Sequence, residues 1–207
     1  MGIPEIARTL FWTTAGFVAG AIPFSLLVGR LALSTDIRDY GDGNPGATNV
    51  FRAGGRAWAF VAVLLDMLKG ALPVALAYTI YAVQGYAMVP IAVAPLVGHL
   101  ASPFLKGRGG KGVAVTGGLW IGLTYGAATA VGLIAMSLGY LVQSVAGWAV
   151  ALGLLAMGAY LALVWPDATH LIVWGITTLL VLWRHREDLG RPPEWRFRSP
   201  NRFRQRR

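Results

Sequence analysis

Residues 113–183 read VAVTGGLWIGLTYGAATAVGLIAMSLGYLVQSVAGWAVALGLLAMGAYLALVWPDATHLIVWGITTLLVLW, and Asp167 is the only aspartate, glutamate, lysine or arginine among them. A helix that crosses a bilayer needs roughly 20 predominantly apolar residues. Two crossings would take about 35 residues each, whereas four would take about 18 each. Helix-breaking patterns divide the stretch at Gly122–Gly126, Gln143–Ser144 and Trp165–Asp167. The stretch therefore predicts four short transmembrane helices.

The composition of the whole chain agrees with a membrane protein. Of 207 residues, 56% are hydrophobic and only 13% are charged, with a mean hydropathy of +0.57. Soluble domains carry about 25% charged residues, enough to cover a water-facing surface. The absence of cysteine excludes a disulfide-rich secreted fold. The fold class predicted is an all-α, polytopic helical bundle.

Three further apolar segments precede this stretch, at about residues 10–33, 57–83 and 86–104. The loops after the first and third of them carry arginine and lysine, which favours a cytoplasmic location. The sequence therefore predicts about seven crossings, with the N-terminus outside and the C-terminus cytoplasmic. Arg8, on the outer side, opposes this orientation.

The positive charge of the chain is concentrated at its end. We expect residues 1–183 to form the membrane domain and residues 184–207 a basic cytoplasmic tail. Nine arginines and three acidic residues give that tail a net charge of 9 − 3 = +6. Such clusters attract anionic lipid headgroups. The charge therefore predicts a membrane anchor, not a nucleic-acid groove.

Two polar loops on the same predicted face have the composition of phosphate-binding segments. The first reads Asp39-Tyr-Gly-Asp-Gly-Asn-Pro-Gly-Ala-Thr-Asn-Val-Phe-Arg52, and its glycines and asparagines offer many N–H donors. The second, Lys106-Gly-Arg-Gly-Gly-Lys-Gly112, leads into a predicted helix, whose N-terminus attracts anions. Together the loops predict a site for phosphorylated substrates.

Several better-known motifs are excluded. Gly41–Gly46 matches G-x-G-x-x-G but lacks the strand that a dinucleotide-binding fold requires. Leu105 and Gly112 replace the glycine and the serine or threonine of a phosphate-binding P-loop. None of the three histidines is followed by aspartate in the His-x4-Asp pattern of many acyltransferases. No histidine or cysteine spacing predicts a metal site.

Asp66 and Lys69 lie within the second predicted span, three residues apart. Charges inside a bilayer are costly, so both side chains should face the interior of the bundle. The spacing allows them to pair on one helix face. Two interpretations stay open: a pair that holds the bundle together, and a pair that lines the site.

Several of these segments resemble the PlsY family of bacterial acyl-phosphate:glycerol-3-phosphate acyltransferases. The resemblance rests on Ala21-Ile-Pro-Phe24, Gly43-Asn-Pro-Gly-Ala-Thr-Asn-Val-Phe-Arg52, Leu65-Asp-Met-Leu-Lys-Gly70, Gly98-His99, Gly109-Gly-Lys-Gly-Val-Ala114 and, less completely, Arg184-His-Arg-Glu187. It implies a seven-span fold in the bacterial inner membrane, with its motifs on the cytoplasmic side. It also implies transfer of a fatty acyl group from acyl phosphate to the 1-hydroxyl of glycerol 3-phosphate, giving lysophosphatidate and phosphate.

The resemblance also implies roles for individual residues, and it implies no cofactor or metal. Because acyl phosphate has a good leaving group, the protein needs no nucleophile and acts by positioning and charge stabilisation. His99, Lys111 and His185 would be catalytic, the histidines by orienting substrate or moving a proton. The substrate-binding residues would be Asn44, Gly46, Ala47, Thr48, Asn49, Arg52, Arg108, Gly109 and Gly110.

The chain departs from the family pattern at three places. Asp42 stands where the family has serine, and Asp188 where it has asparagine. Val142 takes the place of the serine in an Arg-Tyr-x-Ser pattern whose arginine is also absent. Because acidic groups weaken phosphate binding, a transferase with another acceptor stays open beside the glycerol 3-phosphate enzyme. A transporter or flippase of anionic lipids is the alternative from another class.

Overall fold

The structure is a computed structural model that describes residues 2–196. This part of the chain is helical, and its β-type pairing is one isolated bridge between Gln143 and Trp195. The main helices are α1 (Ile3–Ala21), α2 (Phe24–Leu33), α3 (Ala47–Arg52), α4 (Arg56–Ala75), α5 (Met88–Leu100), α6 (Val113–Thr124), α7 (Ala127–Val142), α8 (Ala146–Val164), α9 (Ala168–Arg184) and α10 (Arg186–Leu189).

Four segments of the described chain are long and apolar enough to cross a membrane: Ile3–Leu33, Arg56–Ile80, Gly85–Leu105 and Ala146–Val164. The helices α6, α7 and α9 are apolar but shorter. The predicted breaks in residues 113–183 are confirmed, because they fall between α6 and α7, between α7 and α8, and between α8 and α9. The all-α membrane fold is therefore confirmed, and the number of crossings stays a prediction.

The first apolar segment, predicted over about residues 10–33, is built from two helices. It begins at Ile3 and is interrupted between α1 and α2, where Ile22 is extended and Pro23 precedes Phe24. Proline has no N–H and disfavours helical geometry in the residue before it. The carbonyls that lose their helical partners are bound by side chains: Ser102 Oγ donates to Ala21 O at 2.6 Å, and Lys69 Nζ to Ile22 O at 2.7 Å.

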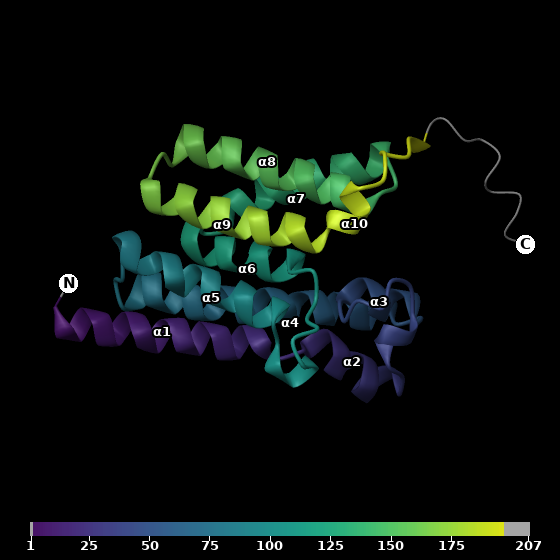
Figure 1. Cartoon of the computed structure of the whole chain (residues 1–207), viewed down its shortest axis with the longest axis horizontal. Helices are drawn as coiled ribbons and strands as arrows, with labels where there is room; N and C mark the ends of the chain where they lie inside the picture. The colour runs from purple at the N-terminus through teal and green to yellow at the C-terminus, as the bar shows by residue number, and fades with distance from the viewer. Residues whose placement is uncertain (1, 197–207) are drawn as a thin grey trace, which may run out of the picture.

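The helices run roughly along one direction, with α1, α4 and α5 on one side, α7, α8 and α9 on the other and α6 between them (Figure 1). Close packing depends on small residues, which let helix backbones approach. A Cβ at Gly118 of α6 would lie 2.8 Å from the Met67 carbonyl carbon of α4. At Gly98 of α5 it would overlap the carbonyl oxygen of Phe17 in α1 and lie 3.0 Å from its carbonyl carbon.

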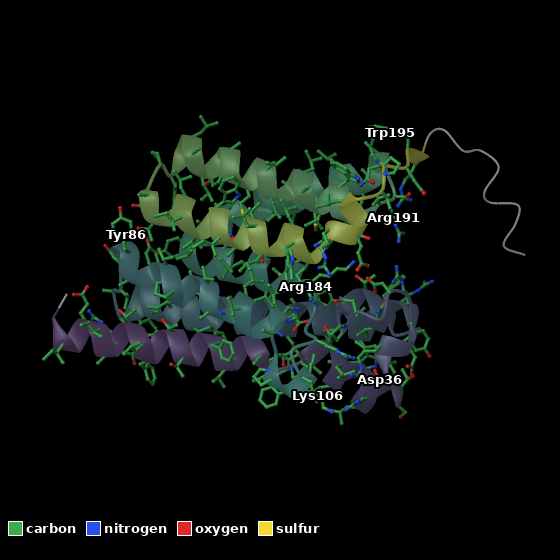
Figure 2. All side chains as sticks on the ribbon, viewed as in Figure 1. Asp36, Tyr86, Lys106, Arg184, Arg191 and Trp195 are labelled. Atoms are coloured by element: carbon green, nitrogen blue, oxygen red, sulfur yellow. The ribbon has the colours of Figure 1, made fainter. Side chains whose placement is uncertain are left out.

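Polar side chains gather at one end of this bundle. Asp36 and Arg191 lie at the end opposite Tyr86 (Figure 2). The loop between α2 and α3 and α10 lie toward this end (Figure 1), and Lys111 from the loop between α5 and α6 contacts both of them. The residues from 190 to 196 fold back on α8, because Trp148 Nε1 donates to Arg191 O at 2.8 Å and Ser144 N to Glu194 O at 3.0 Å. Residues 197–207 of the basic tail lie outside the described residues.

Candidate active site

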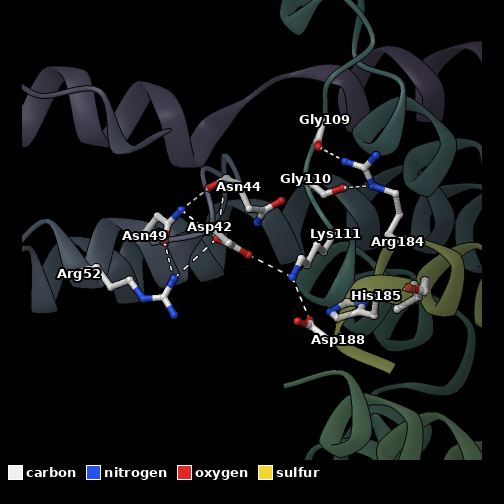
Figure 3. A network of polar contacts seen from close by, with 11 residues as sticks. Asp42, Asn44, Asn49, Arg52, Gly109, Gly110, Lys111, Arg184, His185 and Asp188 are labelled. Atoms are coloured by element: carbon white, nitrogen blue, oxygen red, sulfur yellow. Dashed lines mark hydrogen bonds and ion pairs between the residues drawn. The ribbon is translucent and has the colours of Figure 1, made fainter. Parts of the chain in front are cut away.

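Lys111 stands at the centre of a polar network that joins three separate segments (Figure 3). Its Nζ lies 3.0 Å from Asp42 Oδ2, in the loop before α3, and 3.0 Å from Asp188 Oδ2, in α10. The side chains of Lys111, Asp42 and Asp188 are 26%, 45% and 22% exposed. The three charged groups are therefore partly exposed and accessible to a ligand.

The loop before α3 is folded around Asn49. Asn49 Nδ2 donates to Asp42 Oδ1 at 3.2 Å and to Asn44 O at 2.9 Å, and its Oδ1 accepts from Arg52 NH1 at 2.9 Å. Gly41 has φ +60°, and a Cβ there would also lie 2.6 Å from Asn49 Oδ1. Asn49 thus holds the Asp42 carboxylate next to the Arg52 guanidinium, with Asp42 Oδ1 3.6 Å from Arg52 NH1.

The Gly109–Gly110 backbone runs against the end of α5. Gly109 N donates to Leu100 O at 3.1 Å, and a Cβ at Gly109 would lie 2.7 Å from the same oxygen. A Cβ at Gly110 would lie 2.9 Å from Cε1 of the His99 ring. On its other side, Arg184 donates to the carbonyls of Gly109 and Gly110, to the latter at 3.2 Å. Only glycine allows this loop to pass between a histidine and an arginine.

The side chain of His99 contacts the Asp66–Lys69 ion pair of α4. Lys69 Nζ lies 2.9 Å from His99 Nδ1 and 2.7 Å from Asp66 Oδ1. Ser25 Oγ donates to Asp66 Oδ2 at 2.6 Å. When the lysine is an ammonium it only donates, so Nδ1 of His99 accepts and Nε2 carries the proton. The pair therefore braces the break between α1 and α2 and contacts the histidine that faces Gly110; a role in lining the site stays a prediction.

We expect Asp66→Asn to lower the stability of the folded protein by about 3 kcal/mol, because it leaves the Lys69 ammonium without its buried counter-charge. Thermal unfolding of the detergent-solubilised protein measures this as a lower Tm. The matched control is Asp36→Asn, which removes the exposed pairs with Arg30 and Arg38 and should cost about 1 kcal/mol or less. Equal losses in the two variants would contradict the bracing role.

The ion pair between Lys111 and Asp42 favours the charged form of both groups. Burial by itself would raise the pKa of Asp42, but hydrogen bonding and attraction from Lys111 lower it overall. Burial opposes protonation of Lys111, yet its hydrogen bonds to Asp188 and Asp42 raise its pKa. Burial is the main cause that lowers the pKa of His185. Its Nδ1 lies 2.8 Å from Val181 O, so Nδ1 carries the proton and Nε2 of the neutral ring is the acceptor.

Most of the residues singled out in the sequence meet at this one place. Figure 3 shows seven of them together: Asn44, Asn49, Arg52, Gly109, Gly110, Lys111 and His185. His99 lies next to Gly110. Gly46 caps α3, Ala47 begins it, and Thr48 on it is exposed. Arg108 is exposed and takes no part in the network drawn in Figure 3. Their roles in binding and catalysis stay predictions.

Sequence reasoning missed two features of the site. The sequence marks Arg184 only as part of the basic tail and of a family motif, whereas in the structure its guanidinium donates to both glycine carbonyls. Asp42 and Asp188 stand in the sequence as separate departures from a family pattern, and only the structure shows their shared contact with Lys111. Among the described residues, no group of three or more histidine, aspartate or glutamate side chains is arranged to hold a metal ion.

Comparison with known proteins shows the family to which the chain is related. Residues 10–192 match the family described as glycerol-3-phosphate acyltransferase. A glycerol-3-phosphate acyltransferase from Anaeromyxobacter sp. (strain K) is 39% identical over 195 residues, covering 91% of this chain and 94% of the relative. One from Pseudomonas syringae pv. syringae (strain B728a) is 36% identical over 186 residues, covering 87% and 93%.

A solved structure agrees with these sequence relatives. The crystal structure of PlsY, an integral membrane glycerol 3-phosphate acyltransferase, in its glycerol 3-phosphate form superposes with a TM-score of 0.82. It is 26% identical in sequence, and the match covers 88% of this chain and 90% of that one. An apolar helical bundle, a polar site at one end and these relatives lead to one conclusion: the chain belongs to the glycerol-3-phosphate acyltransferase family.

Proposed function

We propose that this membrane protein transfers a fatty acyl group from acyl phosphate to the 1-hydroxyl of glycerol 3-phosphate. The products are lysophosphatidate and inorganic phosphate. The observation that carries the proposal is the convergence of the two glycine-rich loops: Asp42–Arg52 and Gly109–Lys111 are joined through one ion pair, Lys111–Asp42 at 3.0 Å. Two phosphoryl groups bound to these loops would be neighbours, with the site on the cytoplasmic face of the bacterial inner membrane.

In this reaction the acceptor oxygen attacks the acyl carbonyl carbon, and the bond from that carbon to the phosphate oxygen breaks. The electron pair of the broken bond leaves with the phosphate. Lys111 and the guanidinium of Arg52 supply positive charge where the leaving phosphate becomes more negative. His99, with its proton on Nε2 beside Gly110, donates a hydrogen bond to a phosphoryl oxygen. The protein thereby acts by placing two reactants together.

His185 is the group we assign to receive the proton of the attacking hydroxyl. It lies beside Lys111 and Asp188 (Figure 3), its Nδ1 is bound by Val181 O, and its lowered pKa keeps it neutral at pH 7. A neutral imidazole with a free Nε2 is a suitable general base.

An apolar groove next to the network is the place where we propose that the acyl chain enters the bundle. It lies between α6, α7, α8 and α9 and holds about 40 Å³ of free volume. Val113 and Val181 line it; the first is two residues from Lys111, and the carbonyl of the second binds His185. Apart from Thr116 and Thr129 the lining is glycine and apolar side chains. An acyl carbonyl at the network would therefore place its hydrocarbon chain among the helices.

The proposal is tested with the purified full-length protein in lipid nanodiscs, given acyl phosphate and glycerol 3-phosphate. We expect phosphate and lysophosphatidate to form in equal amounts. Acyl-CoA replaces the donor in one control, and glycerol replaces the acceptor in another. Phosphate release that does not depend on glycerol 3-phosphate would remove the acceptor from the proposal, and transfer from acyl-CoA at the same rate would remove the donor.

We expect His185→Gln to lower kcat about 100-fold, the usual contribution of a general base. Because only the neutral ring accepts a proton and the pKa of His185 is lowered, wild-type kcat should fall only below about pH 6.5, the ordinary histidine pKa. The pH profile of kcat measures this, and the acidic fall should be absent from the variant. A variant that keeps the wild-type acidic fall would exclude His185 as the base.

A further inference from the structure

Lys111 is already neutralised by two carboxylates of its own chain. Asp42 and Asp188 each lie 3.0 Å from Nζ, and they come from opposite sides of the lysine (Figure 3). The three side chains together carry a net charge of −1. A phosphate dianion that binds Lys111 must therefore displace at least one carboxylate or lie against it, and both situations weaken its binding.

The two carboxylates differ from a competing ion in solution because they never diffuse away. A group on the same chain acts as an intramolecular competitor at a high effective concentration. Their ion pairs are also partly exposed, with Asp42 at 45% and Asp188 at 22%, and partly exposed pairs are weak. A dianion that also meets Arg52 can therefore displace them, and they re-form the pairs as soon as the anion leaves.

We infer that Asp42 and Asp188 lower the affinity of Lys111 for phosphate and so speed the release of inorganic phosphate after acyl transfer. This inference rests on the proposed function, in which phosphate is a product held at Lys111. The bond that breaks at release is the ion pair between Lys111 and phosphate, and the bonds that form are the two Lys111–carboxylate pairs. Both aspartates are positioning residues, since they act through Lys111 and not on the reacting atoms.

The test compares binding of inorganic phosphate to the wild-type protein, Asp42→Asn and Asp188→Asn, each full-length in nanodiscs, by titration calorimetry. Asparagine keeps an oxygen for the hydrogen bonds that Asp42 Oδ1 accepts from Asn49 and Asn44. We expect each variant to bind phosphate about two- to fivefold more tightly, the range for loss of one partly exposed competing pair. Inhibition of turnover by added phosphate should strengthen by the same factor.

The matched control is Asp39→Asn, which removes an exposed carboxylate from the same loop and should leave phosphate affinity unchanged. A purely structural role for the aspartates predicts weaker binding, so unchanged or weaker affinity in both variants would overturn the inference. The variants lie in separate segments, so one decides the question if the other misfolds. Tighter phosphate binding without consumption of acyl phosphate would support the inference about affinity and refute the proposed reaction.

Discussion

Lys111→Ala should lower kcat/KM by about 10³, the loss expected when a preorganised charged contact to the transition state is removed. The substitution removes the ammonium that lies between the two loops. It also leaves Asp188 without its ion pair and Asp42 with Arg52 alone, so both carboxylates face the phosphoryl groups. Repulsion between these carboxylates and the substrate adds to the loss of attraction. Turnover of acyl phosphate with glycerol 3-phosphate measures the effect.

The folded protein should tolerate this change. Lys111 is 26% exposed and both of its ion pairs are partly solvated, so their contribution to stability is about 0–1 kcal/mol each. The matched control is Lys106→Ala, which removes an exposed lysine of the same loop and should keep wild-type activity. A folded Lys111→Ala protein with full activity would refute the role of Lys111, and an inactive Lys106→Ala protein would point to a general effect of loop charge.

Gly109→Ala should reduce activity more than 100-fold by displacing the loop that carries Lys111. A Cβ at this position would overlap the His99 carbonyl oxygen and lie 2.7 Å from Leu100 O. Both atoms belong to the backbone at the end of α5, so neither moves as a flexible side chain would. The loop has to shift instead, and shifts of about 1 Å in a positioning site cost about 100-fold in rate.

The natural control is Gly175→Ala in α9. A Cβ there meets no heavy atom within 4 Å, and alanine favours helix over glycine by about 1 kcal/mol. This variant should keep its activity and have a Tm equal to or slightly above that of the wild type. Activity assays and thermal unfolding of both variants side by side test the prediction. If Gly109→Ala were as active as Gly175→Ala, the close approach between the glycine loop and α5 would not position the site.

The candidate site shows how far sequence patterns reach. Glycine, asparagine and lysine in residues 39–52 and 106–112 indicated two phosphate-type loops, because backbone donors and positive charge are properties of a short segment. The same reasoning did not pair Asp42 with Asp188, since the Lys111–Asp188 contact spans 77 positions. Hydropathy also predicts a single apolar segment over residues 10–33 and does not show that it divides into α1 and α2 at Pro23. That break is stabilised by Lys69 and Ser102, whose positions depend on packing.

The sequence by itself determined the membrane class, the helix breaks of residues 113–183 and the identity of the two polar loops. Each follows from local hydropathy and backbone chemistry. In a lipid bilayer these two properties determine helix formation, because buried backbone groups must pair within helices. Only the tertiary structure decided that Arg184 holds the glycine carbonyls, that Lys69 braces His99, and that two carboxylates share Lys111. The physical reason is that side-chain contacts between distant segments depend on how the helices pack, and hydropathy does not specify that packing.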